Sequence, residues 1–209
     1  QRIASMGAEV IVRGSGYDAA AVYAHELEAD GSVYVSAYDD DDIIAGNGGD
    51  LAQEILEDVP DLARVVAPIG GGGMIAGLAE VLCPRGVEVV GAQPRANCAM
   101  YESVQLGRAL VEYGGGATVA EGCEGAVAER TYSIVARHRL DIVLVEEETI
   151  ERAVAETYRH AGQVIECSAA VAVAAVMDLP ARDGATVVLV SGGNIDDQRL
   201  DEILGRYGR

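Results

Sequence analysis

The fold is decided by the stretch Pro68-Ile69-Gly70-Gly71-Gly72-Gly73-Met74-Ile75-Ala76-Gly77. It continues an apolar, β-branched run at 65–69 and opens a segment with helical periodicity over 73–82. Four consecutive residues without side chains let backbone N–H groups converge on one point, beside the partial positive charge of a helix N-terminus. This geometry suits a phosphate group. A tight strand–helix turn without a ligand is the simpler alternative, although a run of glycines is costly in conformational entropy.

Strands and helices alternate along the rest of the chain in the same way. The pattern predicts strands at 8–12, 33–36, 65–69, 87–92, 142–145 and 186–190. It predicts helices at 17–29, up to about 57, 73–82, 96–106, 128–138, 150–160, 168–177 and from 197 onward. Such alternation is typical of an α/β fold with a parallel sheet and helices on both faces. The helix at 168–177 carries no charge, so we expect it to be buried all round.

Composition excludes several classes of protein. The chain has 209 residues, half of them hydrophobic, which is enough for a large packed core. Its net charge of −19 disfavours nucleic acid and anionic membrane surfaces as partners, and no apolar stretch is long enough to span a bilayer. The four cysteines show no metal-ligand spacing, so we expect reduced thiols in a cytoplasmic protein without a metal site.

Lysine is absent, and all 15 basic residues are arginines. The chain therefore has no phosphate-binding loop of the GxxxxGK[ST] type and no side chain that could form a Schiff base. The glycine stretch also fits the dinucleotide pattern GxGxxA from Gly71 to Ala76. A nicotinamide site would need a carboxylate at the end of the next strand, where Ala92 and Gln93 stand instead.

A second glycine cluster follows the last predicted strand, in Val188-Leu189-Val190-Ser191-Gly192-Gly193-Asn194-Ile195-Asp196. Loops at the carboxyl ends of parallel strands surround the ligand crevice of such sheets. We therefore expect Ser191 and the Gly70–Gly73 loop to face the same crevice, with one holding a ring atom and the other a phosphate.

The two clusters, PIGGGGMIAG and VLVSGGNID in this order, resemble the threonine/serine dehydratase (ammonia-lyase) branch of the fold-type II pyridoxal-phosphate enzymes. Further likeness lies in Ser5–Val10, in Tyr38–Gly48 and in Val164–Glu166. The resemblance implies a parallel-sheet α/β sandwich of the tryptophan synthase beta-like kind, N-terminally incomplete. Residues 1–41 would be a remnant of the small α/β domain, and residues 42–209 the C-terminal half of the large cofactor-binding domain.

The resemblance also implies roles for individual residues. The cofactor is pyridoxal 5′-phosphate, and Ser191 would hydrogen-bond its pyridine nitrogen. Glu166 is a candidate catalytic residue near the ring or the substrate, or alternatively a carboxylate at a helix start. The Schiff-base lysine of the family lies upstream of the segment that this chain matches. The cofactor phosphate would be held by Gly70, Gly71, Gly72, Gly73 and Met74.

The activity implied is β-elimination of a hydroxy amino acid to a 2-oxo acid and ammonia. The lysine would lie outside this chain, so the chain alone is expected to be inactive. The alternatives are a serine-type amino-acid racemase on the same scaffold, or a catalytically silent protein that binds pyridoxal phosphate or another anion. Related racemases hold a divalent cation with carboxylates after the strand that ends here at Gln93, and Gln93–Asn97 contains none. The resemblance further implies a small amino acid as substrate and a homo-oligomer, a dimer, in the complete enzyme.

Overall fold

The computed structural model describes residues 2–14 and 16–208. The chain divides into two compact units, Gln1–Val35 and Ser36–Arg209. The expected domain boundary after residue 41 stays a prediction.

The described residues of the first unit form the helices α1 (Arg2–Ser5) and α2 (Tyr17–Glu26) and the 3-10 helix η1 (Leu27–Asp30). The predicted strands at 8–12 and 33–36 are wrong, because neither segment pairs in a sheet within the described residues. Val12 and Val33 are 81% and 87% exposed. A β-branched run becomes a strand only where a neighbouring strand takes its N–H and C=O groups, and here none does.

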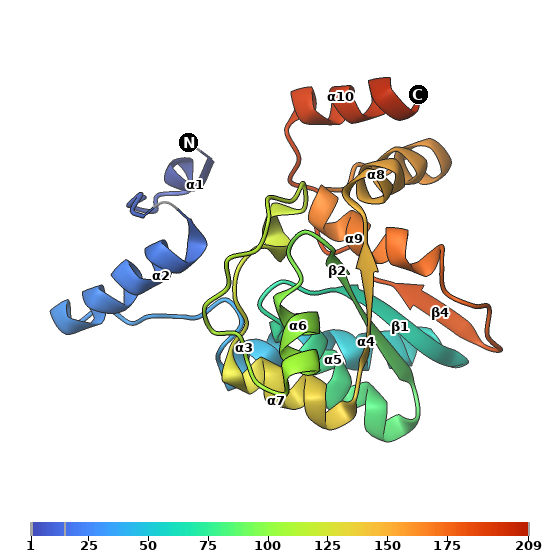
Figure 1. Cartoon of the computed structure of the whole chain (residues 1–209), viewed down its shortest axis with the longest axis horizontal. Coiled ribbons are helices and arrows are strands. Elements are labelled where there is room, and N and C mark those ends of the chain that lie inside the picture. Colours follow the sequence, from blue (N-terminus) through green and yellow to red (C-terminus); the bar gives the residue numbers. More distant parts are fainter. Residues whose placement is uncertain (1, 15, 209) are drawn as a thin grey trace. The chain divides into compact units, whose positions relative to one another are not determined.

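The second unit is built on a four-stranded parallel sheet, which confirms the predicted α/β class. Its strands are β1 (Leu62–Pro68), β2 (Glu88–Pro94), β3 (Asp141–Val145) and β4 (Ala185–Val188), in the order β3-β2-β1-β4 (Figure 1). β4 therefore lies beside β1, on the side opposite β2. The last crossover carries the chain back across the sheet.

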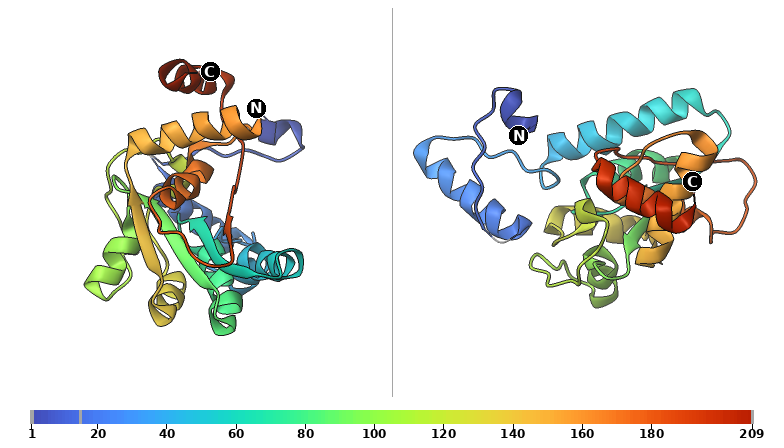
Figure 2. Two further views of the ribbon diagram at one scale, coloured as in Figure 1. Left: turned by 90° about the vertical axis from the view of Figure 1, so that its right-hand side faces the viewer. Right: turned by 90° about the horizontal axis from the view of Figure 1, so that it is seen from above.

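Alternate side chains of the strands enter two separate cores. Val65 and Ala67 face one core, which is closed by α4 (Asp50–Asp58), α5 (Gly73–Leu82), α6 (Ala99–Leu106) and α7 (Glu129–His138). Val66 and Val90 face the other core, which is closed by α8 (Glu147–Ala161), α9 (Cys167–Val176) and α10 (Asp197–Tyr207). Figure 2 shows both layers. Most of α9 is buried, as its lack of charge predicts, but Ser168, Val173 and Val176 are half-buried and Met177, at the end of the predicted helix, is 59% exposed.

The Gly-interrupted helix predicted before residue 57 is three consecutive elements. These are α3 (Asp41–Ile44), a π-helical turn η2 (Ala45–Gly49) and α4. Asp40 caps α3, because its carboxylate accepts from the N–H groups of Asp42 and Ile43 at 2.9 and 3.0 Å. The remaining short elements are the 3-10 helices η3 (Cys83–Arg85) and η4 (Glu121–Cys123).

Two other helices begin away from their predicted positions. α6 begins at Ala99, three residues later than predicted. The amide of Asn97 instead bonds the Gly116 carbonyl and the Gly125 N–H, at 3.2 Å each, which holds the preceding residues in a loop. α8 begins three residues earlier than predicted, at Glu147.

Candidate active site

The two glycine clusters leave neighbouring strands at the same edge of the sheet. β1 and β4 run parallel, and the Leu189 N–H extends their pairing by donating to the Val66 carbonyl at 2.9 Å. The helix that follows β1 lies on one face of the sheet, and the helix that follows β4 lies on the other. This is a topological switch point, the position where open α/β sheets bind ligands. That Ser191 and the Gly70–Gly73 loop face one crevice stays a prediction.

The glycine loop presents an uncapped helix start. Gly72 is the N-cap of α5 and has a left-handed φ of +95°, which favours glycine. The first turn of α5 contains no acidic residue and no side-chain cap. The Ala76 N–H is the first to bond within the helix, to the Gly72 carbonyl at 3.0 Å. The N–H groups of Gly73, Met74 and Ile75 therefore have no partner in the helix and can bind an anion.

Close neighbours explain why this loop contains no side chains. A Cβ on Gly71 would overlap the ring of Tyr38, and a Cβ on Gly70 would overlap the Gly122 carbonyl oxygen. A Cβ on Gly72 would lie 2.7 Å from Met100 Cε. Tyr38 is thus a wall of the loop that sequence reasoning did not assign. The signal for it in the sequence is the Tyr38–Gly48 stretch, which resembles the dehydratase branch.

Glu166 lies against the loop that follows β4. Its backbone N–H donates to the Gly192 carbonyl at 3.1 Å, and its carboxylate accepts from the Asn194 N–H at 3.1 Å. Glu166 is the N-cap residue of α9, but its side chain makes no capping bond to that helix. The structure therefore brings Glu166 to the Ser191–Asn194 segment, where Ser191 itself is exposed.

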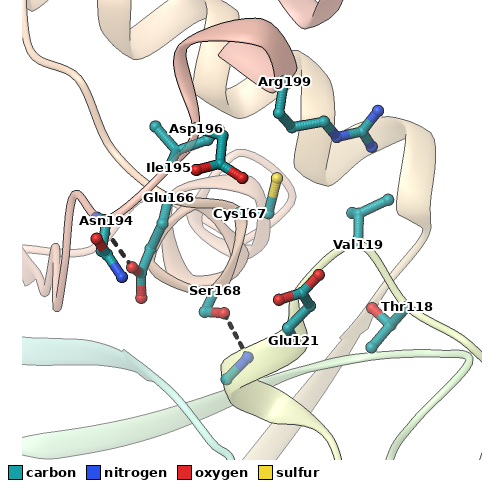
Figure 3. A pocket seen from close by; sticks show the side chains of 11 residues that line it. Thr118, Val119, Glu121, Glu166, Cys167, Ser168, Asn194, Ile195, Asp196 and Arg199 are labelled. Atoms are coloured by element: carbon teal, nitrogen blue, oxygen red, sulfur yellow. Dashed lines mark hydrogen bonds between the residues drawn. The ribbon is translucent and has the colours of Figure 1, made fainter. Parts of the chain in front are cut away.

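A cavity of about 620 Å³ opens beside these residues (Figure 3). Its wall includes the carboxylates of Glu121, Glu166 and Asp196. The one basic residue in the wall, Arg199, already pairs with Glu151 at 2.6 Å. The cavity is large enough for an amino acid, but its negative charge repels a phosphate.

The cavity wall reaches the glycine loop through the Glu121–Gly122 turn. The Ser168 hydroxyl, in the first turn of α9, accepts from the Gly122 N–H at 2.9 Å (Figure 3). The Gly122 carbonyl in turn lies against Gly70. The start of α9, the Glu121–Gly122 turn and the glycine loop therefore form one continuous wall.

The cysteines near this wall are unsuited to nucleophilic attack. Burial, together with the carboxylates of Glu166 and Glu147, raises the pKa of the Cys123 thiol to about 12. Burial also raises the pKa of the Cys167 thiol to about 11, against the opposing charge of Arg199. Both thiols stay protonated at neutral pH, whereas nucleophilic attack requires the thiolate.

Among the described residues, no three His, Cys, Asp or Glu side chains are grouped as metal ligands. At the end of β2, the Gln93 side chain instead accepts from the Tyr101 N–H at 2.9 Å. No helix in residues 2–14 and 16–208 has both the length and the hydropathy of a membrane span.

The sequence model of the family described as "Pyridoxal-phosphate dependent enzyme" matches residues 1–193. The chain belongs to this family. Pyridoxal 5′-phosphate is the cofactor of the family, and the parallel α/β sheet is the fold that the family implies.

Known relatives refine this assignment. A catabolic L-threonine dehydratase of Staphylococcus aureus (strain N315) is 36% identical over 208 residues, covering 95% of this chain and 59% of the relative. The processed threonine deaminase isoform 2 of Solanum lycopersicum superposes with a TM-score of 0.85 at 27% identity, covering 97% of this chain and 58% of that one. A serine racemase of Dictyostelium discoideum gives 0.81 at 25% identity, covering 93% and 64%. The chain thus spans about three fifths of the length of these proteins.

Proposed function

We propose that this protein is a pyridoxal-phosphate-dependent threonine/serine dehydratase, which converts a hydroxy amino acid to a 2-oxo acid and ammonia. The observation that carries the proposal is the placement of the glycine loop and the Ser191 loop on the adjacent ends of β1 and β4. The similarity to a threonine dehydratase over 95% of the chain supports the same reaction class.

We assign the cofactor phosphate to the start of α5. The uncapped N–H groups of the first turn and the absence of an acid there fit a phosphate dianion. The loop has no room for side chains, so the backbone itself forms the cradle. The residues that hold the phosphate are Gly70, Gly71, Gly72, Gly73 and Met74.

Ser191 is assigned to the pyridine nitrogen. A hydroxyl can hydrogen-bond this nitrogen but does not stabilise a proton on it as a carboxylate would. The bound cofactor supplies an electron sink for the electrons left when the Cα proton departs. A serine at this position would leave the ring neutral and the electron sink weaker, which fits the elimination that we propose.

Glu166 is assigned to the substrate side of the site. Its carboxylate is half-buried, lines the cavity and is held in place by the Asn194 N–H. In that position it attracts the ammonium group of an amino acid. The chain has no lysine, so we place the residue that holds the cofactor covalently and accepts the Cα proton outside these 209 residues. A dimeric and cytoplasmic complete enzyme is part of the same proposal.

Cofactor binding by the 209-residue chain tests these assignments. Titration followed by ³¹P NMR is expected to show reversible binding of both inorganic phosphate and pyridoxal phosphate. Gly71→Ala should weaken both ligands, because the new Cβ overlaps Tyr38. Gly114→Ala is the matched control, since a Cβ there meets nothing within 4 Å.

Ser191→Ala separates the two parts of the site. Loss of one hydrogen bond should weaken pyridoxal phosphate about three- to tenfold and leave inorganic phosphate unchanged. Borohydride treatment should yield no pyridoxyl-lysine. A wild-type chain that binds neither ligand would refute the site.

The reaction itself is assayed on the full gene product, after the coding DNA has been read upstream of the Gln1 codon. L-threonine and L-serine are expected to yield 2-oxo acid and ammonia. Formation of D-serine without 2-oxo acid would show a racemase instead. A gene product that binds the cofactor but converts neither amino acid would show a silent binding protein.

A further inference from the structure

Thr131 lies behind the glycine loop, in the first turn of α7. The residue is fully buried. Its hydroxyl is 2.8 Å from the Gly71 carbonyl oxygen and 3.2 Å from the Ala128 carbonyl oxygen. The Ala128 carbonyl already accepts from the Tyr132 N–H at 3.0 Å. The single hydroxyl proton therefore goes to Gly71, the shorter contact.

This hydrogen bond sets the direction of a peptide group in the loop. The described residues contain no cis peptide bond, so the Gly71 carbonyl and the Gly72 N–H point in opposite directions. A carbonyl turned toward Thr131 therefore turns the Gly72 N–H away from α7. Without the hydrogen bond, a glycine–glycine peptide could rotate easily, because neither residue has a Cβ.

A second buried side chain holds another backbone carbonyl just before the loop. Gln93 is 1% exposed, and its amide nitrogen lies 3.4 Å from the Ile69 carbonyl oxygen. The carbonyls of Ile69 and Gly71 are two residues apart, and each is held by a side chain from the protein interior. In each of these trans peptide groups the N–H of the next residue, Gly70 or Gly72, points away from the side chain that holds the carbonyl.

We propose that Thr131 is a positioning residue of the phosphate site, whose hydroxyl fixes the Gly71 carbonyl so that the Gly72 N–H is presented to the phosphate. The role rests on the proposed function, because it presumes that the glycine loop binds phosphate. Thr131 itself does not touch the ligand. It orients the Gly71–Gly72 peptide group, and this effect comes from its hydroxyl group and not from its methyl group.

Two substitutions separate the hydroxyl from the methyl group. Thr131→Val retains the shape and packing but loses the donor, whereas Thr131→Ser retains the donor and loses the methyl group. The ligands are inorganic phosphate and pyridoxal phosphate, titrated into the 209-residue chain and followed by ³¹P NMR. The ¹⁵N and ¹H shifts of the Gly72 amide report the direction of the peptide group without any ligand.

Thr131→Val is expected to weaken both ligands at least about fivefold and to move the Gly72 amide signal. Thr131→Ser is expected to bind within about twofold of wild type and to keep that signal. Thr157→Val is the matched control, because the Thr157 hydroxyl donates to the Ala153 carbonyl at 2.8 Å within α8. It should lower the melting temperature without changing phosphate affinity.

Wild-type affinity in Thr131→Val, or a loss of affinity in Thr131→Ser equal to that in Thr131→Val, would overturn the role of the hydroxyl. If the valine variant does not fold, the ligand affinity of Thr131→Ser alone decides whether the hydroxyl group or the packing of the methyl group matters. A wild-type chain that binds neither ligand overturns the proposed function as well, so the two failures are distinguishable.

Discussion

At the scale of single residues, direct contact between two backbones determines where glycine is required. Gly48 in η2 is buried against the first turn of α5, where a Cβ would overlap the Met74 carbonyl oxygen. A Cβ on Gly77 of α5 would overlap the Ile44 carbonyl oxygen in return. The π-helical turn and the helix of the phosphate site therefore touch without intervening side chains.

Gly48→Ala is expected to lower the free energy of unfolding by about 2–3 kcal/mol or more, because a backbone atom cannot move aside as a side chain can. Gly46→Ala is the control two residues away. A Cβ on Gly46 meets nothing within 4 Å, so alanine should stabilise the helix by about 0.5–1 kcal/mol. Urea unfolding of both variants measures the contrast, and equal effects would contradict it.

At the scale of elements, a buried carboxylate attaches the last helix to the rest of the second unit. Glu151 of α8 is 4% exposed. It accepts hydrogen bonds from Arg199 at 2.6 Å, from Arg206, and from the Tyr207 hydroxyl at 3.2 Å, all of them on α10. The buried Ile203 and Leu204 add apolar contacts. The loop that carries Ser191 leads directly into this helix, so the docking of α10 also restrains the candidate site.

Glu151→Gln should cost about 1–2 kcal/mol of stability, because a buried carboxylate loses its charged hydrogen bonds to two arginines that are 34% and 53% exposed and that water can solvate. The amides of α10 should then exchange with solvent faster than those of α5, as seen by hydrogen-exchange mass spectrometry. Glu148→Gln is the control, since its ion pair with Arg152 is exposed and contributes only about 0.3–0.5 kcal/mol. Unchanged exchange in α10 after Glu151→Gln would show that apolar contacts alone hold the helix.

At the scale of the whole molecule, buried thiols link stability to alkaline pH. Burial, with nearby carboxylates, raises the pKa of Cys123 and Cys167 from 9.0 to about 12 and about 11. The unfolded chain ionises these thiols near pH 9, whereas the folded chain keeps them neutral. Their contribution to stability is therefore complete below pH 9 and is lost as the pH rises toward 11 and 12.

The free energy of unfolding should fall by about 2–3 kcal/mol between pH 8 and pH 10 through these two thiols. Urea titrations at the two pH values measure the difference. In the double variant Cys123→Ala/Cys167→Ala, the decrease should be smaller by that amount. An equal decrease in wild type and double variant would assign the pH dependence to other groups or to the net charge of −19.

Local patterns predicted most of the second unit. A strand predicted at 65–69 is found at Leu62–Pro68, and a helix predicted at 73–82 is found with those bounds, because β-branched runs and apolar periodicity act over a few neighbours. Most of the uncharged helix α9 is buried, as its composition indicates. The predictions of strands at 8–12 and 33–36 were wrong because a strand also needs a partner strand from elsewhere in the chain, which local patterns do not reveal.

The sequence by itself determined the α/β class, the glycine loop at a helix start and the absence of lysine. Only the tertiary structure decided that β4 lies beside β1 and that the Glu166 carboxylate accepts a hydrogen bond from the Asn194 N–H. It also placed Tyr38 and Thr131 against the glycine loop. Helix periodicity, turns and caps are set by residues close in sequence. Which distant side chains meet depends on how the whole core packs, and no local pattern records that.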